Sequence, residues 1–437
     1  MLVRNLMTGV ALAAMLASSA LAAEMPAAQP VVLKAARMFD AAAGKIVSPG
    51  LVVVQGDRIE AVGANAHLPD GAKVIDFGDA TLTPGFIDAH VHMGEEDSSD
   101  WYRNFFNKTQ RHPAELALRA TANTRKMVEA GFTTVRDVGG EDYIALGLRN
   151  AIAAGIVEGP RMLVANYAVG STGGHADDRN YRPDLVPQSG PLLGVCNGAD
   201  ECRAAVRYQI KYGADVIKFM PSGGVLSLTD PVDVPELSQE EMNAIVSEAH
   251  AWHRKVAAHC HGDLAAKMAI KAGVDSIEHG TFLSEETLKL MKEKGTYLVP
   301  TLFATYWVGK HADEYPPAMG EKARAAAAQG QKMFAMAAKA GTKVAFGTDA
   351  AVEPHGLGAF EFSLMTSAGF TPVQALQAAM TGAADLLGVS ADAGTLEAGK
   401  LADIVVLPGN PVEDIHVTEH PKFVMHGGKV VKDATAG

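Results

Sequence analysis

The chain reads GFIDAHVH at residues 85–92, an apolar stretch that ends in the two histidines His90 and His92. Its composition is that of a buried strand. In a strand, residues two apart point to the same face, so both imidazoles lie on one side and can bind one metal ion. Asp88 lies on that face too, one step deeper. A His-x-His pair also occurs as two unrelated polar residues at a strand end, so its meaning depends on the rest of the chain.

Seven further candidate strands follow and alternate with helical patterns. The strands cover residues 133–138, 161–166, 214–220, 256–260, 276–279, 297–302 and 344–349, and helices such as 113–130, 240–254 and 321–340 separate most of them. Eight parallel strands with helical crossovers predict an α/β fold, a (β/α)8 TIM-like barrel, whose reactive side chains lie at the C-terminal ends of the strands. A doubly wound open sheet is the alternative that the pattern leaves open.

Both ends of the chain show short strands without helices. They cover residues 31–33, 50–54, 58–62 and 73–76 before the barrel, and 402–407, 423–425 and 430–431 after it. Each set is too small to close a core alone, so we expect the two to pair into one small β-sandwich. The predicted boundaries are 23–82 and 393–437 for the sandwich and 83–392 for the barrel.

The first 22 residues are typical of a secretory signal peptide. Arg4 precedes the apolar run 6–21, and the sequence ALA at 20–22 fits a small-x-small cleavage site. The run is short for a bilayer span, and no stop-transfer pattern follows it. An uncleaved anchor or a buried first helix is the alternative. We therefore expect export to the periplasm or secretion, with no membrane span after the signal is removed.

The formal net charge of −12 disfavours nucleic acids and anionic membrane surfaces as partners. The chain has three cysteines. Cys196 and Cys202 can pair in an oxidising compartment, although their spacing alone does not show that the side chains face each other. Cys260 lies between two histidines, and we expect it to be a small buried side chain rather than a nucleophile.

Single ligand-type residues end three more candidate strands. His259 ends the stretch VAAH, His279 ends DSIEH, and Asp349 ends FGTD. A lone histidine at such a place is more often a satisfied core residue, but two at consecutive strand ends of one barrel point at one central volume. Four imidazoles and one carboxylate suit zinc, and also manganese or cobalt.

Lys218 lies inside the apolar stretch VIKFM at residues 216–220. A buried ammonium is costly to keep charged. On chemistry alone, a salt bridge to Asp215 or another acid, or contact with solvent, comes first as the explanation. The alternative is reaction of the neutral amine with carbon dioxide, which gives a carbamate that bridges two metals. Beside five metal-type ligands at matching strand ends, we favour this N6-carboxylated lysine.

The order of these residues resembles the binuclear amidohydrolase superfamily, with His-x-His on strand 1, Lys on strand 4, His on strands 5 and 6 and Asp on strand 8. The sequences TPGFID at 83–88 and GTLEAGKLADI at 394–404 share the likeness. Within the superfamily, TVRDVGG at 134–140, STGGH at 171–175 and SGGV at 222–225 resemble the branch of zinc carboxypeptidases and Xaa-Pro dipeptidase-like enzymes. That branch includes amidohydrolases that cut ochratoxin A.

The resemblance implies two zinc or other divalent ions per chain and a hydroxide that bridges them. The implied metal ligands are His90, His92, Lys218, His259, His279 and Asp349. Asp349 is then placed to take the proton of the hydroxide and pass it to the leaving amine. His175 and His261 match no metal position, so we assign them to substrate binding, with ordinary loop histidines as the alternative. Arg136 has Asp137 and a substrate carboxylate as candidate partners.

The predicted function is hydrolysis of the amide bond of N-acyl amino acids or dipeptides, with ochratoxin A as a candidate substrate. Hydrolysis of a cyclic amide or ester is an alternative. Deamination is disfavoured because related deaminases place a glutamate where this chain has Gly262. A non-catalytic metal-binding periplasmic protein is disfavoured because Lys218 and Asp349 are both present.

The expected partners are a small-molecule or dipeptide substrate and further copies of the chain in a homo-oligomer. We assign selectivity to loops at residues 94–111, 306–320 and 350–360, where Glu353 faces either a basic substrate group or water.

Overall fold

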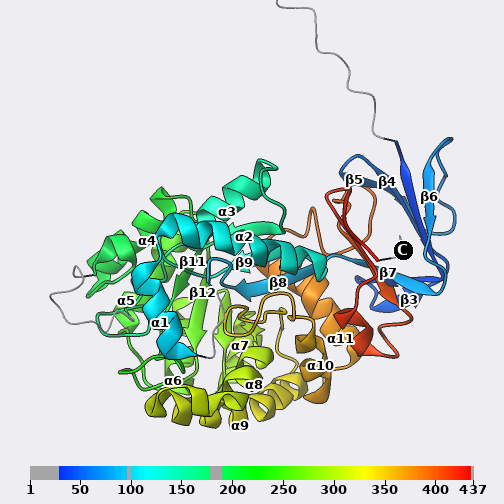
Figure 1. The fold of residues 1–437 in the computed structure, drawn as a ribbon. Helices are drawn as coiled ribbons and strands as arrows, with labels where there is room; N and C mark the ends of the chain where they lie inside the picture. Colours follow the sequence, from blue (N-terminus) through cyan, green and yellow to red (C-terminus); the bar gives the residue numbers. More distant parts are fainter. Residues whose placement is uncertain (1–28, 96–99, 178–188, 435–437) are drawn as a thin grey trace, which may run out of the picture.

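The structure is a computed structural model that describes residues 29–95, 100–177 and 189–434. It is a mixed α/β protein, in which a large unit of parallel strands covered by helices adjoins a smaller unit of strands (Figure 1). The predicted signal peptide at residues 1–22 lies outside the described residues. None of the helices in the described ranges combines the length and the apolar character that a bilayer span requires.

Seven parallel strands form most of a ring in the larger unit. They make one three-stranded and one four-stranded sheet: β8 (Phe86–Val91), β9 (Phe132–Asp137) and β10 (Arg161–Val164), then β11 (Val216–Phe219), β12 (Lys255–Cys260), β13 (Ser276–His279) and β14 (Tyr297–Val299). The two sheets join next to β10, where Val169 pairs in parallel with Phe219.

Residues 344–349, which were predicted to be the eighth strand, complete the ring but do not form a regular strand. On one side Val344 bridges to Leu298 of β14, and on the other Ala350 bridges to Val91 of β8. Between them, the N–H of Phe346 donates to Ala378 O at 3.0 Å rather than to either neighbouring strand, although Phe346 O accepts from Ala89 N of β8 at 2.8 Å. The segment therefore occupies the position of a strand while its ladder of hydrogen bonds is interrupted.

Several predicted strands are shorter than their apolar stretches. The stretch 161–166 ends as a strand at Val164, and Asn166 then has a left-handed backbone with φ of 63°. The stretch 297–302 ends at Val299, because Thr301 has φ of 47° and a helix begins at Leu302. A left-handed residue cannot continue a β-ladder, so each of these two strands ends two residues before it.

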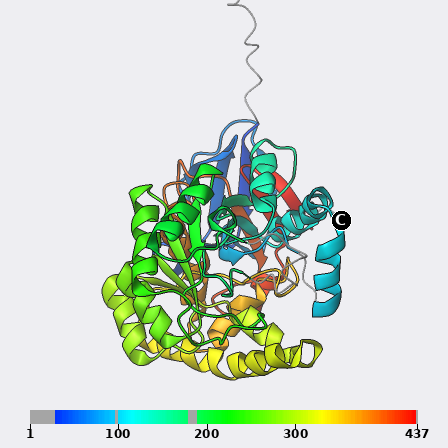
Figure 2. The same ribbon diagram turned by 90° about the vertical axis from the view of Figure 1, so that its left-hand side faces the viewer.

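Helices surround the ring, as the turned view shows (Figure 2). Those between consecutive strands include α2 (Pro113–Glu129), α3 (Ile144–Ala153), α4 (Ala199–Lys211), α5 (Gln239–Ala251), α6 (Asp263–Ala272) and α7 (Glu285–Lys294). After β14 come α8 (Leu302–Lys310) and the long α9 (Pro317–Ala340), and after the eighth segment α10 (Phe360–Ser367), α11 (Pro372–Gln377) and α12 (Ala383–Leu387).

Two of the predicted selectivity loops are largely helical. Residues 306–320 contain the end of α8 and the start of α9, and residues 94–111 contain α1 (Trp101–Gln110). The loop interpretation was therefore wrong for most of the described length of these two segments.

Strands from both chain ends share one sheet in the smaller unit, where blue and red strands lie together (Figure 1). That sheet contains β7 (Ala80–Pro84), β2 (Arg37–Asp40) and β3 (Lys45–Val47) beside β15 (Ile404–Pro408), β16 (Phe423–His426) and β17 (Lys429–Asp433). A second sheet contains β1 (Val31–Ala35), β4 (Gly50–Gln55), β5 (Arg58–Val62) and β6 (Lys73–Asp76). Leu33 and Val52 of the second sheet share a buried cluster with Ile404 and Phe423 of the first.

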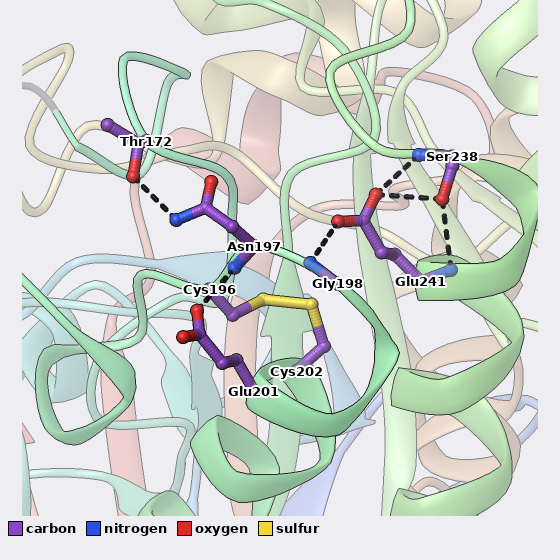
Figure 3. The surroundings of a disulfide bond; sticks show 8 residues. All are labelled: Thr172, Cys196, Asn197, Gly198, Glu201, Cys202, Ser238 and Glu241. Atoms are coloured by element: carbon purple, nitrogen blue, oxygen red, sulfur yellow. Dashed lines mark hydrogen bonds between the residues drawn. A yellow bond between two sulfur atoms is a disulfide. The ribbon is translucent and has the colours of Figure 1, made fainter.

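A disulfide joins Cys196 to Cys202, so the proposed pairing of these cysteines is present (Figure 3). It connects a loop to the first turn of α4. Glu241 supports the same loop, because its carboxylate accepts a hydrogen bond from Gly198 N at 2.6 Å while it completes the capping box of α5 with Ser238. Cys260 is free and buried, as predicted.

Candidate active site

The first group of candidate metal ligands lies at the C-terminal end of β8. His90 and His92 each place Nε2 at 3.2 Å from Oδ1 of Asp349. Asp349 belongs to the irregular eighth segment, and its N–H donates to His90 O at 2.8 Å. The fold therefore brings together three predicted ligands from the two ends of the barrel sequence.

The second group lies at the C-terminal ends of β12 and β13. Nδ1 of His259 and Nε2 of His279 are 2.9 Å apart, and Nδ1 of His279 lies 2.7 Å from Oγ1 of Thr301. His261 supplies a third nitrogen to this group, and its ring stacks on that of His279 with centroids 4.9 Å apart. His261, predicted to bind substrate, is thus within reach of both the ligand group and the cavity.

Lys218 on β11 lies beside these groups. Its Nζ is 3.5 Å from Nε2 of His90, and the residue is 1% exposed. Asp215 pairs with Arg149 at 2.5 Å instead, and no acid of the described ranges forms an ion pair with Lys218. Burial lowers the pKa of Lys218 to about 8, and nearby carboxylates offset part of this effect. The structure therefore does not show the salt bridge that was the first explanation for Lys218.

Burial and the carboxylate of Asp349 together set the pKa values of three candidate ligand histidines. It holds the pKa of His259 and of His279 well below the usual range, so both imidazoles are neutral, which is the form that binds metal. Burial acts in the same direction on His92, but the hydrogen bond and charge of Asp349 outweigh it and raise the pKa of His92 to about 9. Burial would raise the pKa of Asp349, yet His90 and His92 hold it well below the usual range.

Two candidate ligands have a left-handed backbone, His279 with φ of 67° and Asp349 with φ of 70°. This conformation costs a residue with a side chain about 1–2 kcal/mol. Such residues gather at functional sites, where the surrounding structure holds them in place.

The donor set fits divalent metal ions. His259 and His279 face each other with two ring nitrogens that can share only one proton between them. Nε2 of His259 is also buried without a hydrogen-bond partner among the described residues. Neutral imidazoles and carboxylate at the open end of a barrel are the ligands that zinc and similar ions take in hydrolases.

The chain matches the amidohydrolase family over residues 81–431. It belongs to the amidohydrolase family. It is 34% identical to ochratoxinase of Aspergillus niger over 419 residues, which cover 90% of this chain and 85% of that protein. A solved Xaa-Pro dipeptidase with bound methionine is similar with a TM-score of 0.87 and 38% identity, over 92% of this chain and 99% of that one.

A prolidase in complex with N-methylphosphonate-L-proline is similar with a TM-score of 0.84 and 36% identity, over 93% of this chain and 100% of that one. These likenesses confirm the superfamily and the branch predicted from the motifs. They also support the TIM-like barrel.

A buried hydrogen-bond network beside the first ligand group of this amidohydrolase was not predicted from the sequence. Glu278 on β13 places Oε2 at 2.7 Å from Nδ1 of His90. Its Oε1 accepts a hydrogen bond from Nη2 of Arg136 at 2.8 Å, and Arg136 also donates to Ser276 Oγ at 3.2 Å. Arg136 therefore pairs with Glu278 rather than with Asp137, and it is buried and does not line the central cavity.

The signal for this network was present in the strand patterns. Ser276 and Glu278 lie two apart in β13, and Arg136 is a charged residue inside the apolar strand β9. Buried charges require partners, so an arginine and a glutamate on separate interior strands predict each other. Arg136 and His90 hold the pKa of Glu278 at about 2, although burial opposes this.

We expect Glu278→Gln to weaken metal binding by about 10–100-fold, because an outer carboxylate orients a ligating histidine and raises its basicity. The variant also leaves the buried guanidinium of Arg136 without a counter-charge, so the protein should unfold at lower temperature. Competition with a chromophoric chelator measures the affinity. Glu286→Gln is the matched control, since that carboxylate is exposed on α7 and pairs with Lys267. Equal metal affinity in both variants would remove Glu278 from this role.

Both residues predicted to bind substrate line the central cavity. His175, in the loop after β10, places its ring 4.4 Å from that of His259, and burial lowers its pKa to about 4. The backbone N–H of His175 donates to the carboxylate of Glu236, and Nδ1 of its ring lies 3.2 Å from Ser227 Oγ. Nδ1 of His261 is 2.8 Å from a threonine hydroxyl. Each ring therefore has a fixed orientation toward the cavity.

The cavity has a volume of about 270 Å³ and two kinds of lining side chain. The candidate ligands, Lys218 and the two substrate histidines supply polar groups. Apolar side chains line much of the rest: Trp101, Val225, Leu226, Ala304, Val308, Tyr315 and Val352.

Glu353 takes neither of its predicted positions. It is fully buried, both carboxylate oxygens lack a partner among the described residues, and it is not part of the cavity lining. Burial and the charges of Asp349 and Asp88 raise its pKa well above the usual range. Glu353 is thus an interior residue rather than a selectivity group.

Proposed function

We propose that this amidohydrolase hydrolyses the amide bond of N-acyl amino acids or dipeptides, with two zinc ions and an N6-carboxylated Lys218. The observation that carries the proposal is the meeting of two groups of ligands around one buried lysine in a cavity of about 270 Å³. The printed activities of the relatives, ochratoxinase and Xaa-Pro dipeptidase, are consistent with such substrates.

When bound, the metal ions would lower the pKa of a water and polarise the scissile carbonyl. His90, His92 and Asp349 would hold one ion, His259 and His279 the other, and carboxylated Lys218 both. Asp349 would take the proton of the attacking water at its carboxylate and pass it to the leaving amine.

His175 and His261 would bind the substrate. Their N–H groups would donate to the oxyanion or to the carboxylate of the leaving amino acid. Apart from Lys218, the lining residues that the structure describes include no lysine and no arginine, so these imidazoles are the side chains best placed for a carboxylate.

A screen of zinc-loaded enzyme with N-acyl amino acids, dipeptides and ochratoxin A tests the proposed activity. Release of the free amino acid, followed by mass spectrometry, is the expected result. Turnover of cyclic amides, esters or amino-heterocycles with none of the open-chain amides would contradict it.

We expect about two zinc-class ions per chain, because six ligands around a bridging group serve two sites. Metal analysis of protein purified without chelator gives the number. His259→Asn should lose about one ion, while His250→Asn should keep both, since His250 pairs with Asp275 outside the cavity. One ion or fewer in a fully active wild type would contradict the binuclear site.

We also propose that the enzyme is exported and acts in the periplasm or outside the cell. The Cys196–Cys202 disulfide supports this, because such bonds persist in oxidising compartments. Cleavage after Ala22 and assembly into a homo-oligomer stay predictions.

A further inference from the structure

Lys322 is a half-buried lysine on α9 whose ammonium group donates hydrogen bonds to the backbone of one loop. Its Nζ donates to the carbonyl oxygens of Gly224 at 2.7 Å, Ser227 at 2.6 Å and Asp230 at 3.1 Å. An ammonium has three hydrogens, so these bonds use its full donor capacity. The acceptors belong to residues 222–231, which follow β11 and which we call the 222–231 loop.

The 222–231 loop forms one wall of the cavity. Val225 and Leu226 line it together with Val308 of α8 and Tyr315, and these side chains pack in one apolar cluster. Lys322 lies on α9, the helix that packs on α8. It therefore connects the loop to α9, which packs on the helix that carries the cavity-lining Val308.

The loop also controls the position of a substrate histidine. Ser227 Oγ lies 3.2 Å from Nδ1 of His175 and also donates to Gly224 O at 3.1 Å. A Cβ atom on Gly224 would lie 2.1 Å from the ring of His175. Gly224 N donates to the carboxylate of Asp230 at 2.7 Å, which folds the loop back on itself. A shift of the loop therefore moves the histidine and the apolar wall together.

We infer that Lys322 is a positioning residue for substrate selection. It holds the 222–231 loop so that Val225 and Leu226 complete a subsite for a bulky, uncharged apolar group of the substrate. This inference rests on the proposed amide hydrolysis. Complete burial of a large apolar side chain corresponds to a preference of about 10–100-fold over glycine.

Kinetics with the dipeptides Gly-Gly, Phe-Gly and Gly-Phe test the selection. Wild type should prefer at least one phenylalanine peptide over Gly-Gly by about 10–100-fold in kcat/KM. Lys322→Met keeps the aliphatic stem but removes all three donors, and it should lose most of this preference, chiefly through KM of the phenylalanine peptide. Lys322→Arg, which retains charge and donors, should recover part of it. Metal content should stay equal in all variants.

Lys332→Met is the control, because Lys332 is exposed on the same helix. Amide hydrogen exchange provides a readout that needs no turnover: peptides from the 222–231 loop should exchange faster in Lys322→Met than in wild type or Lys332→Met. Unchanged selectivity or unchanged exchange in Lys322→Met would overturn the inference, as would a wild type that cleaves the three peptides equally. A wild type that cleaves none of the peptides, nor any other open-chain amide, counts against the proposed function, while the exchange result still tests the role of Lys322.

Discussion

Asp349→Asn should abolish amide hydrolysis while the barrel still folds. The carboxylate is the proposed general base, and an amide cannot accept a proton near neutral pH. Losing a general base costs about 10²–10⁴-fold in rate. Asparagine is the appropriate replacement because position 349 has φ of 70°, a conformation that asparagine tolerates and that would strain most other residues.

Asp142→Asn is the matched control for this variant. Asp142 also has a left-handed backbone, with φ of 56°, but it is exposed and belongs to neither group of ligands. Steady-state rates should be compared at measured metal content, because Asp349 is also a candidate ligand. A rate within about tenfold of wild type at equal metal occupancy would assign the base to another residue, and His261 would be the next candidate.

Lys218→Ala should lose bound metal and hydrolysis together. In the proposed site the carbamate on Lys218 bridges both ions, so its removal leaves each of them with an incomplete set of ligands. Acetate or propionate should restore part of the metal content and part of the rate, because a small carboxylate can enter the space of the deleted side chain. Metal analysis and activity at increasing carboxylate concentration measure both effects.

Lys255→Ala is the control for a lysine on a barrel strand. Lys255 begins β12 at the exposed end, where it pairs with Asp275 at 3.0 Å. It should keep normal metal content and show no response to acetate. If Lys218→Ala also kept normal metal content and rate, the carbamate assignment would be wrong. A loss of metal without rescue would leave Lys218 important for the site but would count against the bridging role.

The sequence by itself determined the barrel strands and the residues at their ends. Alternation of apolar strands and helices is a local property, and it located β8, β12 and β13 almost to the residue. Ligand-type residues at these ends were recognisable because the C-terminal ends of parallel strands face one common opening. His90, His92 and Asp349 could thus be placed together although more than half of the chain separates them.

Tertiary structure alone decided how these residues are held. The strand patterns indicate that interior charges need partners, but the hydrogen bonds that join Glu278 to His90 and Arg136 depend on how β13 faces β8 and β9 across the closed barrel. In the sequence Lys322 is an ordinary helix lysine, because its contact with the 222–231 loop depends on how α9 packs against that loop. Helix α8 replaced a predicted loop for a related reason: its apolar residues lie between α9 and the cavity, so their burial depends on neighbours that are distant in the sequence. Local patterns report what a segment can form, whereas partners across the barrel depend on the packing of the whole chain.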